Sequence, residues 1–147
     1  MKDFYVSVGQ TVTFSKTVSE SDVYLFAGIT GDLAPVHVNQ ALMERSAYGQ
    51  RIAHGALLVG FMSTLSTLMV DQAEDALVNG ETPVALGYDR IRFTAPVFFG
   101  DTITLTYTIT AVDTVKRRSL ADIEAKNQRN EIVAVATGLL KWVRKED

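Results

Sequence analysis

The chain has 147 residues and a mass of 16.1 kDa, which is enough for a single domain covering residues 1–147. Its composition, with 47% hydrophobic and 21% charged residues, is that of a globular protein and excludes a mainly disordered chain. A net charge of -3 gives no broad positive field, so we expect no nucleic-acid partner. The lack of cysteine excludes disulfides, thiolate nucleophiles and cysteine-ligated zinc.

The first residues of the chain predict a strand and then a helix. Residues 1–9 lack the basic start and apolar stretch of a signal peptide, so we expect a cytoplasmic protein. Alternating polar and apolar residues over Thr11–Val18 indicate a half-buried strand. Ser19 followed by Asp22 is typical of a helix N-cap, and Gly31 is expected to end that helix.

A proline-containing segment and two further helices follow. Over Asp32–Val38 the proline disfavours helix, so a rigid extended loop is expected. Asn39 is placed to cap a short helix that runs through Arg45. The run Ala56–Val70 is apolar on nearly every face but shorter than the roughly 20 residues that span a bilayer, which indicates a buried core helix and no membrane partner.

The last part of the chain predicts four strands. Gly100-Asp101 and Arg129-Asn130 have hairpin length, so an antiparallel meander is expected. Because the core helix must be covered on more than one side, we predict an α+β fold in which one curved antiparallel sheet wraps around a long central helix. The four segments are Val84–Thr94, Thr102–Val112, Ser119–Asn127 and Ile132–Val143.

The chain has only two histidines, His37 and His54, and both precede the central helix. Asp32 lies five residues before His37 across a loop stiffened by Pro35, so the two side chains could face one small volume and hold a water. Such a pair suits acid and base chemistry because histidine changes charge near neutral pH. In the alternative interpretation, Asp32 caps a turn after Gly31 and His37 satisfies a backbone carbonyl.

Gly55 stands at the expected start of the central helix. A helix amino terminus offers unpaired N–H groups and a partial positive charge, and glycine allows a ligand oxygen, such as a thioester carbonyl, to approach. Alternatively, Gly55 only relieves crowding where the helix enters the sheet, and His54 is a structural histidine whose hydrogen bonds are satisfied. Both interpretations stay open at this point.

Other chemistries have little support. Asp32, His37 and His54 contain the residue types of a two-histidine, one-carboxylate metal centre, but their spacing argues against one, so no metal is expected. The glycines around the central helix are too dispersed for a phosphate-binding loop, so no nucleotide cofactor is implied. No serine stands in a G-x-S-x-G elbow, which disfavours covalent acyl transfer.

Three segments together carry a family resemblance: GDLAPVHVN at Gly31–Asn39, AHGALLVGFMS at Ala53–Ser63 and FTAPVFFGDT at Phe93–Thr102. Over nearly its whole length the chain resembles the MaoC-like dehydratases, or (R)-specific enoyl-CoA hydratases. That resemblance implies a hotdog fold, a homodimer or larger homo-oligomer, and a hydro-lyase. The implied reaction hydrates a trans-2-enoyl thioester to the (R)-3-hydroxyacyl product, or runs in reverse.

The resemblance also implies roles for particular residues. Asp32 and His37 match the catalytic dyad, the backbone N–H of Gly55 matches the group that holds the thioester oxygen, and Ser63 matches a polar helix position near the dyad. It implies syn addition of one water, with no metal and no redox cofactor. Coenzyme A or an acyl carrier protein would enter only as part of the substrate.

The loop departs from the family pattern at one position. Where the family reads G-D-x-N-P-x-H, this chain has Ala34 in place of the asparagine. Loss of that amide would either weaken hydration or make room for a bulkier or polar acyl group. A hotdog thioesterase and a non-catalytic acyl-CoA-binding protein are the alternatives, and the pairing of Asp32 with His37 in one loop favours the hydratase over the thioesterase.

Overall fold

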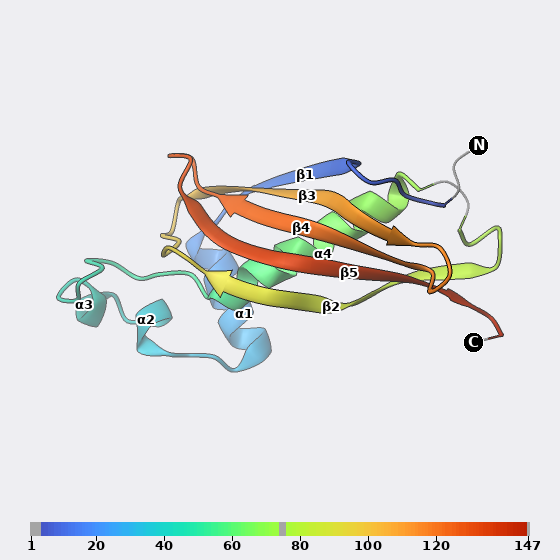
Figure 1. Ribbon diagram of the computed structural model, residues 1–147. Coiled ribbons are helices and arrows are strands. Elements are labelled where there is room, and N and C mark those ends of the chain that lie inside the picture. The colour runs from blue at the N-terminus through green and yellow to red at the C-terminus, as the bar shows by residue number, and fades with distance from the viewer. Residues whose placement is uncertain (1–3, 74–75, 147) are drawn as a thin grey trace.

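The computed structural model describes residues 4–73 and 76–146. Five strands and four helices follow one another along these residues (Figure 1). In chain order they are β1 (Thr11–Thr17), α1 (Glu20–Thr30), α2 (Pro35–Val38), α3 (Gln40–Met43), α4 (Gly55–Asp71), β2 (Glu81–Phe93), β3 (Thr102–Asp113), β4 (Arg118–Lys126) and β5 (Ile132–Arg144).

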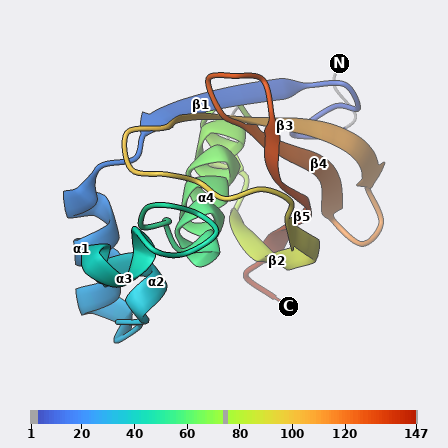
Figure 2. The ribbon, with the colours of Figure 1, turned by 90° about the vertical axis from the view of Figure 1, so that its left-hand side faces the viewer.

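The five strands form one antiparallel sheet in the order β1-β3-β4-β5-β2. The sheet curves over α4, with α1, α2 and α3 gathered beside one end of that helix (Figure 2). Strict alternation in β3 sets which face is buried, because its apolar side chains Ile103, Leu105, Tyr107 and Ile109 all point into the core. The expected α+β architecture, a curved sheet around a long central helix, is confirmed.

The expected meander is correct for β3, β4 and β5 but wrong for β2. Strand β2 pairs with β5 at the far edge of the sheet, because β3 already has β1 and β4 on its two sides. The turn at Gly100-Asp101 therefore makes no hairpin with β2. Instead it docks on the end of β1, where the Gly100 N–H donates to the Val18 carbonyl at 2.7 Å and the Val18 N–H donates to the Asp101 carbonyl at 2.8 Å.

Helix α4 is buried or half-buried on most sides, as expected, and is exposed along a single face. Leu58, Met62, Leu65 and Met69 are buried in the core beneath the sheet. No helix within the described ranges is long and apolar enough to cross a membrane. Small residues at helical spacing form the opposite, exposed face of α4, and they are Ala56, Gly60, Ser63 and Thr67.

The segment expected to be an extended loop contains α2. Ala34 is extended, with φ -56° and ψ 139°, as expected of a residue that precedes a proline. Pro35 then occupies the first helical position, where the N–H that it lacks would have no partner. Asn39 caps α3 as predicted, accepting from the Leu42 N–H at 3.0 Å, although α3 is shorter than expected and ends at Met43.

Both ends of α1 match their sequence signals. Ser19 Oγ accepts from the Asp22 N–H at 3.1 Å, and Asp22 Oδ2 accepts from the Ser19 N–H at 2.9 Å, which completes a capping box. At the other end, Gly31 adopts the left-handed conformation with φ 82°. The helix therefore delivers the next residue, Asp32, at a defined place beside the start of α4.

The capping box makes the stability of α1 depend on pH. The Ser19 N–H, aided by Lys16 Nζ at 3.1 Å, holds the pKa of Asp22 below its usual range despite partial burial. A lowered native pKa stabilises the fold above the unfolded value, and this contribution is lost as the pH falls through the native pKa. Asp22→Asn keeps an acceptor without the charge. We expect the substitution to lower the free energy of unfolding by about 0.5–1 kcal/mol at pH 7 and to leave it unchanged at acid pH, as measured by urea unfolding. A difference that stays constant with pH would contradict this account.

Candidate active site

Asp32 follows the left-handed turn that ends α1. Its backbone N–H donates to Thr30 Oγ1 at 3.2 Å, and its Oδ1 accepts from the Ala34 N–H at 3.3 Å. Asp32 therefore does cap the local turn, as one of the two interpretations held. Its other oxygen, Oδ2, faces His37 and His54, and the side chain is 52% exposed.

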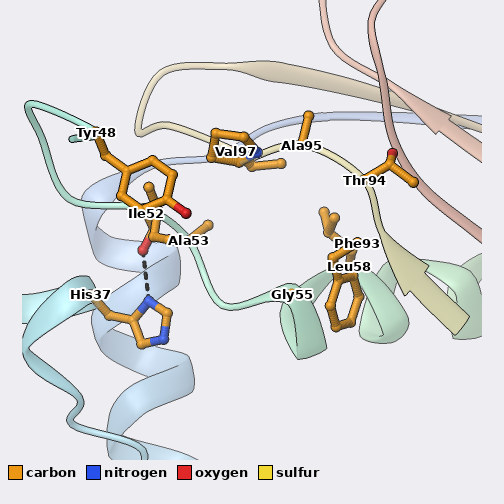
Figure 3. Close-up of a pocket in the computed structure, with 11 residues that line it drawn as sticks. His37, Tyr48, Ile52, Ala53, Gly55, Leu58, Phe93, Thr94, Ala95 and Val97 are labelled. Atoms are coloured by element: carbon orange, nitrogen blue, oxygen red, sulfur yellow. Dashed lines mark hydrogen bonds between the residues drawn. The ribbon is translucent and has the colours of Figure 1, made fainter.

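His37 lies on α2, with its side chain only 11% exposed. Its Nδ1 lies 2.7 Å from the carbonyl oxygen of Ile52 (Figure 3). Because a carbonyl can only accept, Nδ1 carries a proton, and in the neutral imidazole Nε2 then has a lone pair. That Nε2 lies 4.0 Å from Asp32 Oδ2, which is too far for a direct hydrogen bond but suits a bridging water.

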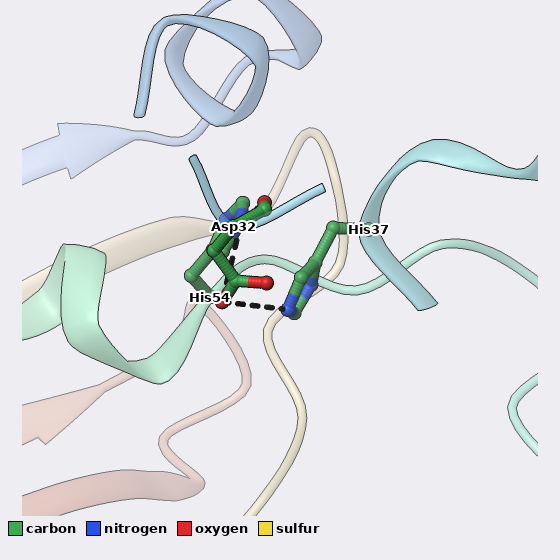
Figure 4. Close-up of side chains that lie close together, drawn as sticks. All are labelled: Asp32, His37 and His54. Atoms are coloured by element: carbon green, nitrogen blue, oxygen red, sulfur yellow. Dashed lines mark hydrogen bonds and ion pairs between the residues drawn. The ribbon is translucent and has the colours of Figure 1, made fainter. Parts of the chain in front are cut away.

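His54 joins the other two side chains (Figure 4). Its Nε2 donates to the backbone carbonyl of Asp32 at 2.9 Å, and its ring stacks on that of His37 with centroids 3.7 Å apart. The view of His54 as a fully satisfied structural histidine is wrong, because its buried Nδ1 has no hydrogen-bond partner within the described residues. The sequence signal for His54 is that it is one of only two histidines and that both precede α4.

These three residues were also the candidate metal ligands. Sequence spacing does not keep them apart, because one oxygen or nitrogen from each lies within 4.8 Å of the others. Their arrangement still fits a zinc ion poorly. Asp32 Oδ2 is 4.0 Å from each Nε2, whereas tetrahedral ligands about 2.0 Å from zinc are about 3.3 Å apart. In addition, the His54 Nε2 proton is already donated to the Asp32 carbonyl.

A cavity of about 320 Å³ opens beside His37, between the segment that leads into α4 and the loop that follows β2 (Figure 3). Most of its lining is apolar, as expected of a site for a small organic group. Asp32 is not part of that lining but meets His37 at its edge. The lining residues are His37, Tyr48, Ile52, Ala53, Gly55, Leu58, Phe93, Thr94, Ala95, Pro96 and Val97.

Gly55 is the first residue of α4 and lines this cavity. Helix geometry provides no acceptor for N–H groups of the first turn, so a ligand oxygen can take that place. The crowding interpretation also holds, because a Cβ at Gly55 would lie 2.5 Å from the ring of Phe93. The absence of a side chain at Gly55 thus leaves room for the Phe93 ring and also lets a ligand reach the amino terminus of α4.

The family is decided by comparison with known proteins. Residues 3–131 match the family model described as the MaoC like domain. The chain belongs to the MaoC-like dehydratase family. It is 37% identical over 107 residues to the (R)-specific enoyl-CoA hydratase of Rhodospirillum rubrum, which covers 73% of this chain and 68% of that protein. It is 29% identical over 142 residues to the 3-hydroxybutyryl-CoA dehydratase of Methylorubrum extorquens, covering 97% of this chain and 84% of the relative.

A solved structure agrees with this family assignment. The (R)-hydratase of A. caviae involved in PHA biosynthesis superposes with a TM-score of 0.78 at 26% identity, over 92% of this chain and 96% of that chain. The expected hotdog fold and the hydro-lyase reaction class are therefore confirmed. The roles assigned within the family to Asp32, His37, Gly55 and Ser63 stay predictions.

Ser63 lies apart from the other predicted MaoC-like site residues. It is on the exposed face of α4, eight residues beyond Gly55, which is about 12 Å along a helix. It does not line the cavity beside His37. Its role near the dyad therefore stays a prediction from the family resemblance.

Contact with Phe93 should make Gly55 intolerant of a side chain. We expect Gly55→Ala to cost about 1–3 kcal/mol, because the new Cβ must displace the aromatic ring. Gly28→Ala is the matched control, since Gly28 is also helical and its Cβ would meet nothing within 4 Å, so it should stabilise by up to about 1 kcal/mol. Urea unfolding measures both, and equal effects of the two variants would refute the packing role.

Proposed function

We propose that this protein catalyses the reversible hydration of a trans-2-enoyl thioester to the (R)-3-hydroxyacyl thioester. The observation that carries the proposal is the 4.0 Å gap between Asp32 Oδ2 and His37 Nε2, two hydrogen-bond acceptors that face each other at the edge of an apolar cavity. The names of the relatives, enoyl-CoA hydratase and 3-hydroxybutyryl-CoA dehydratase, support the same substrate class.

A water in that gap is activated by both side chains. It donates one hydrogen to the Asp32 carboxylate and the other to His37 Nε2, which leaves an oxygen lone pair for the β-carbon of the enoyl group. The new bond joins this oxygen to the β-carbon while one O–H bond and the Cα=Cβ π bond break, and the π electrons move toward the thioester carbonyl. The dyad holds the released proton and delivers it to the α-carbon on the same face. Dehydration follows the same steps in reverse.

Negative charge builds on the thioester oxygen as the water adds. The backbone N–H of Gly55, at the amino terminus of the 17-residue helix α4, stabilises that charge through a hydrogen bond and the helix dipole. Apolar lining residues such as Leu58 and Val97 exclude bulk water and accommodate the acyl chain. Each step is a proton transfer or an addition, so the proposal requires no metal or redox cofactor. Coenzyme A or an acyl carrier protein is the carrier.

The direct test is to mix purified protein with crotonyl-CoA and longer enoyl-CoAs and to follow the enoyl-thioester absorbance, with product analysis. Loss of absorbance with formation of (R)-3-hydroxyacyl-CoA is the expected result. Release of free coenzyme A would instead identify a thioesterase, which attacks the carbonyl carbon. Tight acyl-CoA binding without turnover would identify a binding protein, and either outcome refutes the proposal.

Substitution of the dyad should remove turnover without unfolding the chain. We expect Asp32→Asn and His37→Gln each to lower kcat by about 10²- to 10⁴-fold, because both groups act on one water. The double variant should lose little more than either single variant, since the effects are not additive. Turnover within a few-fold of wild type in either folded single variant would refute the assignment.

Ala34 has a structural consequence that the sequence did not suggest. It is the N-cap residue of α2, the helix that carries His37, and it provides no side-chain cap. Asparagine is among the best N-cap residues, so Ala34→Asn should add about 0.5–2 kcal/mol of stability, measured by urea unfolding. Asn39→Ala, which removes the cap of α3, should lose a similar amount.

The same Ala34→Asn variant tests the two interpretations of the departure from the family. Because Ala34 does not line the cavity, we expect no change in acyl selectivity but a kcat higher by about 5- to 150-fold on every enoyl-CoA. Initial rates on a panel of acyl chains measure this. A selective loss on one acyl type would contradict it and would show that the alanine makes room for that group.

The proposed enzyme is a homodimer or a larger homo-oligomer. Strands β1 and β2 are sheet edges, and edges of folded proteins are usually covered or paired. The small-residue face of α4 is exposed in one chain although the helix is apolar overall. Light scattering at micromolar concentration should give at least twice 16.1 kDa. A mass of 16.1 kDa would contradict this prediction.

A further inference from the structure

His54 contacts both members of the proposed dyad, and the proposed mechanism gives it no role. It is 2% exposed and immediately precedes α4, but its side chain does not cap that helix. Burying an imidazole with one ring nitrogen unpaired is costly, and a residue kept only for packing would not require it. A reason for burying His54 must therefore come from the contacts of its Nε2 and of its ring.

The Nε2 contact connects His54 to the backbone of Asp32. At 2.9 Å from a carbonyl oxygen, Nε2 must carry the proton and donate it. This hydrogen bond spans 22 positions in sequence and joins the loop after α1 to the start of α4. The Asp32 side chain is half exposed, so its position depends on how firmly its backbone is held.

The ring of His54 fixes the other half of the dyad. It lies 3.7 Å from the His37 ring, centroid to centroid, with 27° between the planes (Figure 4). Phe26, from α1, also packs on His54, with centroids 4.7 Å apart. The His37 imidazole therefore cannot tilt toward His54, while its Nδ1 is held by the Ile52 carbonyl.

We infer that His54 is a positioning residue for the hydration reaction. Its Nε2–H holds the Asp32 backbone, its ring supports the His37 imidazole, and together these contacts keep Asp32 Oδ2 and His37 Nε2 at the separation that one water can bridge. His54 does not line the cavity, so it acts on turnover through the dyad and not through substrate binding. This inference rests on the proposed function.

Two substitutions of His54 by side chains of similar length distinguish the hydrogen bond that it donates from the packing of its ring. Glutamine places an amide N–H close to the position of Nε2, whereas methionine has similar length and no donor. We expect His54→Met to lower kcat on crotonyl-CoA by about 10- to 100-fold, as a misplaced group does, with KM within about threefold of wild type. His54→Gln should recover most of that loss at an equal melting temperature. A purely structural role would instead lower stability in both variants and make no distinction in kcat.

Nitrogen NMR gives a readout that is independent of activity. The chain has only two histidines, so the spectrum of wild type contains two imidazoles, and either His54 variant assigns the one that remains. We expect the proton on Nδ1 in His37 and on Nε2 in His54. A wild-type His54 protonated on Nδ1 alone overturns the inference even if a variant fails to fold.

The kinetic outcomes also separate the two claims. A wild type that turns over enoyl-CoA, with a His54→Met variant within threefold of its kcat, refutes the role of His54 alone. Equal kcat in the folded Gln and Met variants refutes the donor function. A wild type that hydrates no enoyl-CoA refutes the proposed function and, with it, the positioning role.

Discussion

The hydrogen bond from His37 Nδ1 to the Ile52 carbonyl determines which atoms of the site are free to react. It assigns the proton to one ring nitrogen and directs the lone pair of the other toward Asp32. The acceptor is itself well held, because the Ile52 N–H donates to the Val36 carbonyl at 3.0 Å and the Ala53 N–H donates to the Val97 carbonyl at 2.8 Å. The tautomer is thus set by backbone atoms, whose positions depend on the fold and not on a mobile side chain.

Helix α4 connects this local arrangement to the core of the protein. Its buried side chains anchor it beneath the sheet, and its amino terminus consequently points at the cavity beside His37. Close approach of Phe93 to Gly55 joins that terminus to the end of β2. The packing that stabilises the domain therefore also directs the partial positive charge at the amino terminus of α4 toward the cavity.

Much of the fold could be predicted because its signals are local. The strand at β3 and the Ser19 N-cap depend on patterns among neighbouring residues, and both appear in the structure as expected. The partner of β2 could not be predicted in this way, because strand pairing depends on which edges are already occupied. The sequence does not predict helix α2, because a proline usually disfavours helix, although the first helical turn tolerates it.

Spacing in the sequence predicted only the contact between site residues that are close along the chain. Asp32 and His37 share one loop, so their meeting could be expected. His54 reaches Asp32 across 22 positions, and no periodicity or spacing rule relates the two. The position of His54 beside Asp32 depends on how the loop after α1 folds back on the start of α4, which is tertiary structure and not a local pattern.

Two separate parts of the chain form the cavity wall, and this affects how the ligand preference of such a protein can change in evolution. Asp32, His37, His54 and Gly55 all lie on one continuous segment, whereas residues 93–97 contribute mainly apolar surface from the opposite side. Substitutions in that second segment can reshape the space for a ligand while the hydrogen bonds of the first remain intact. Ligand preference can therefore evolve separately from reactivity, and a duplicated copy could acquire a new preference without first passing through an inactive form.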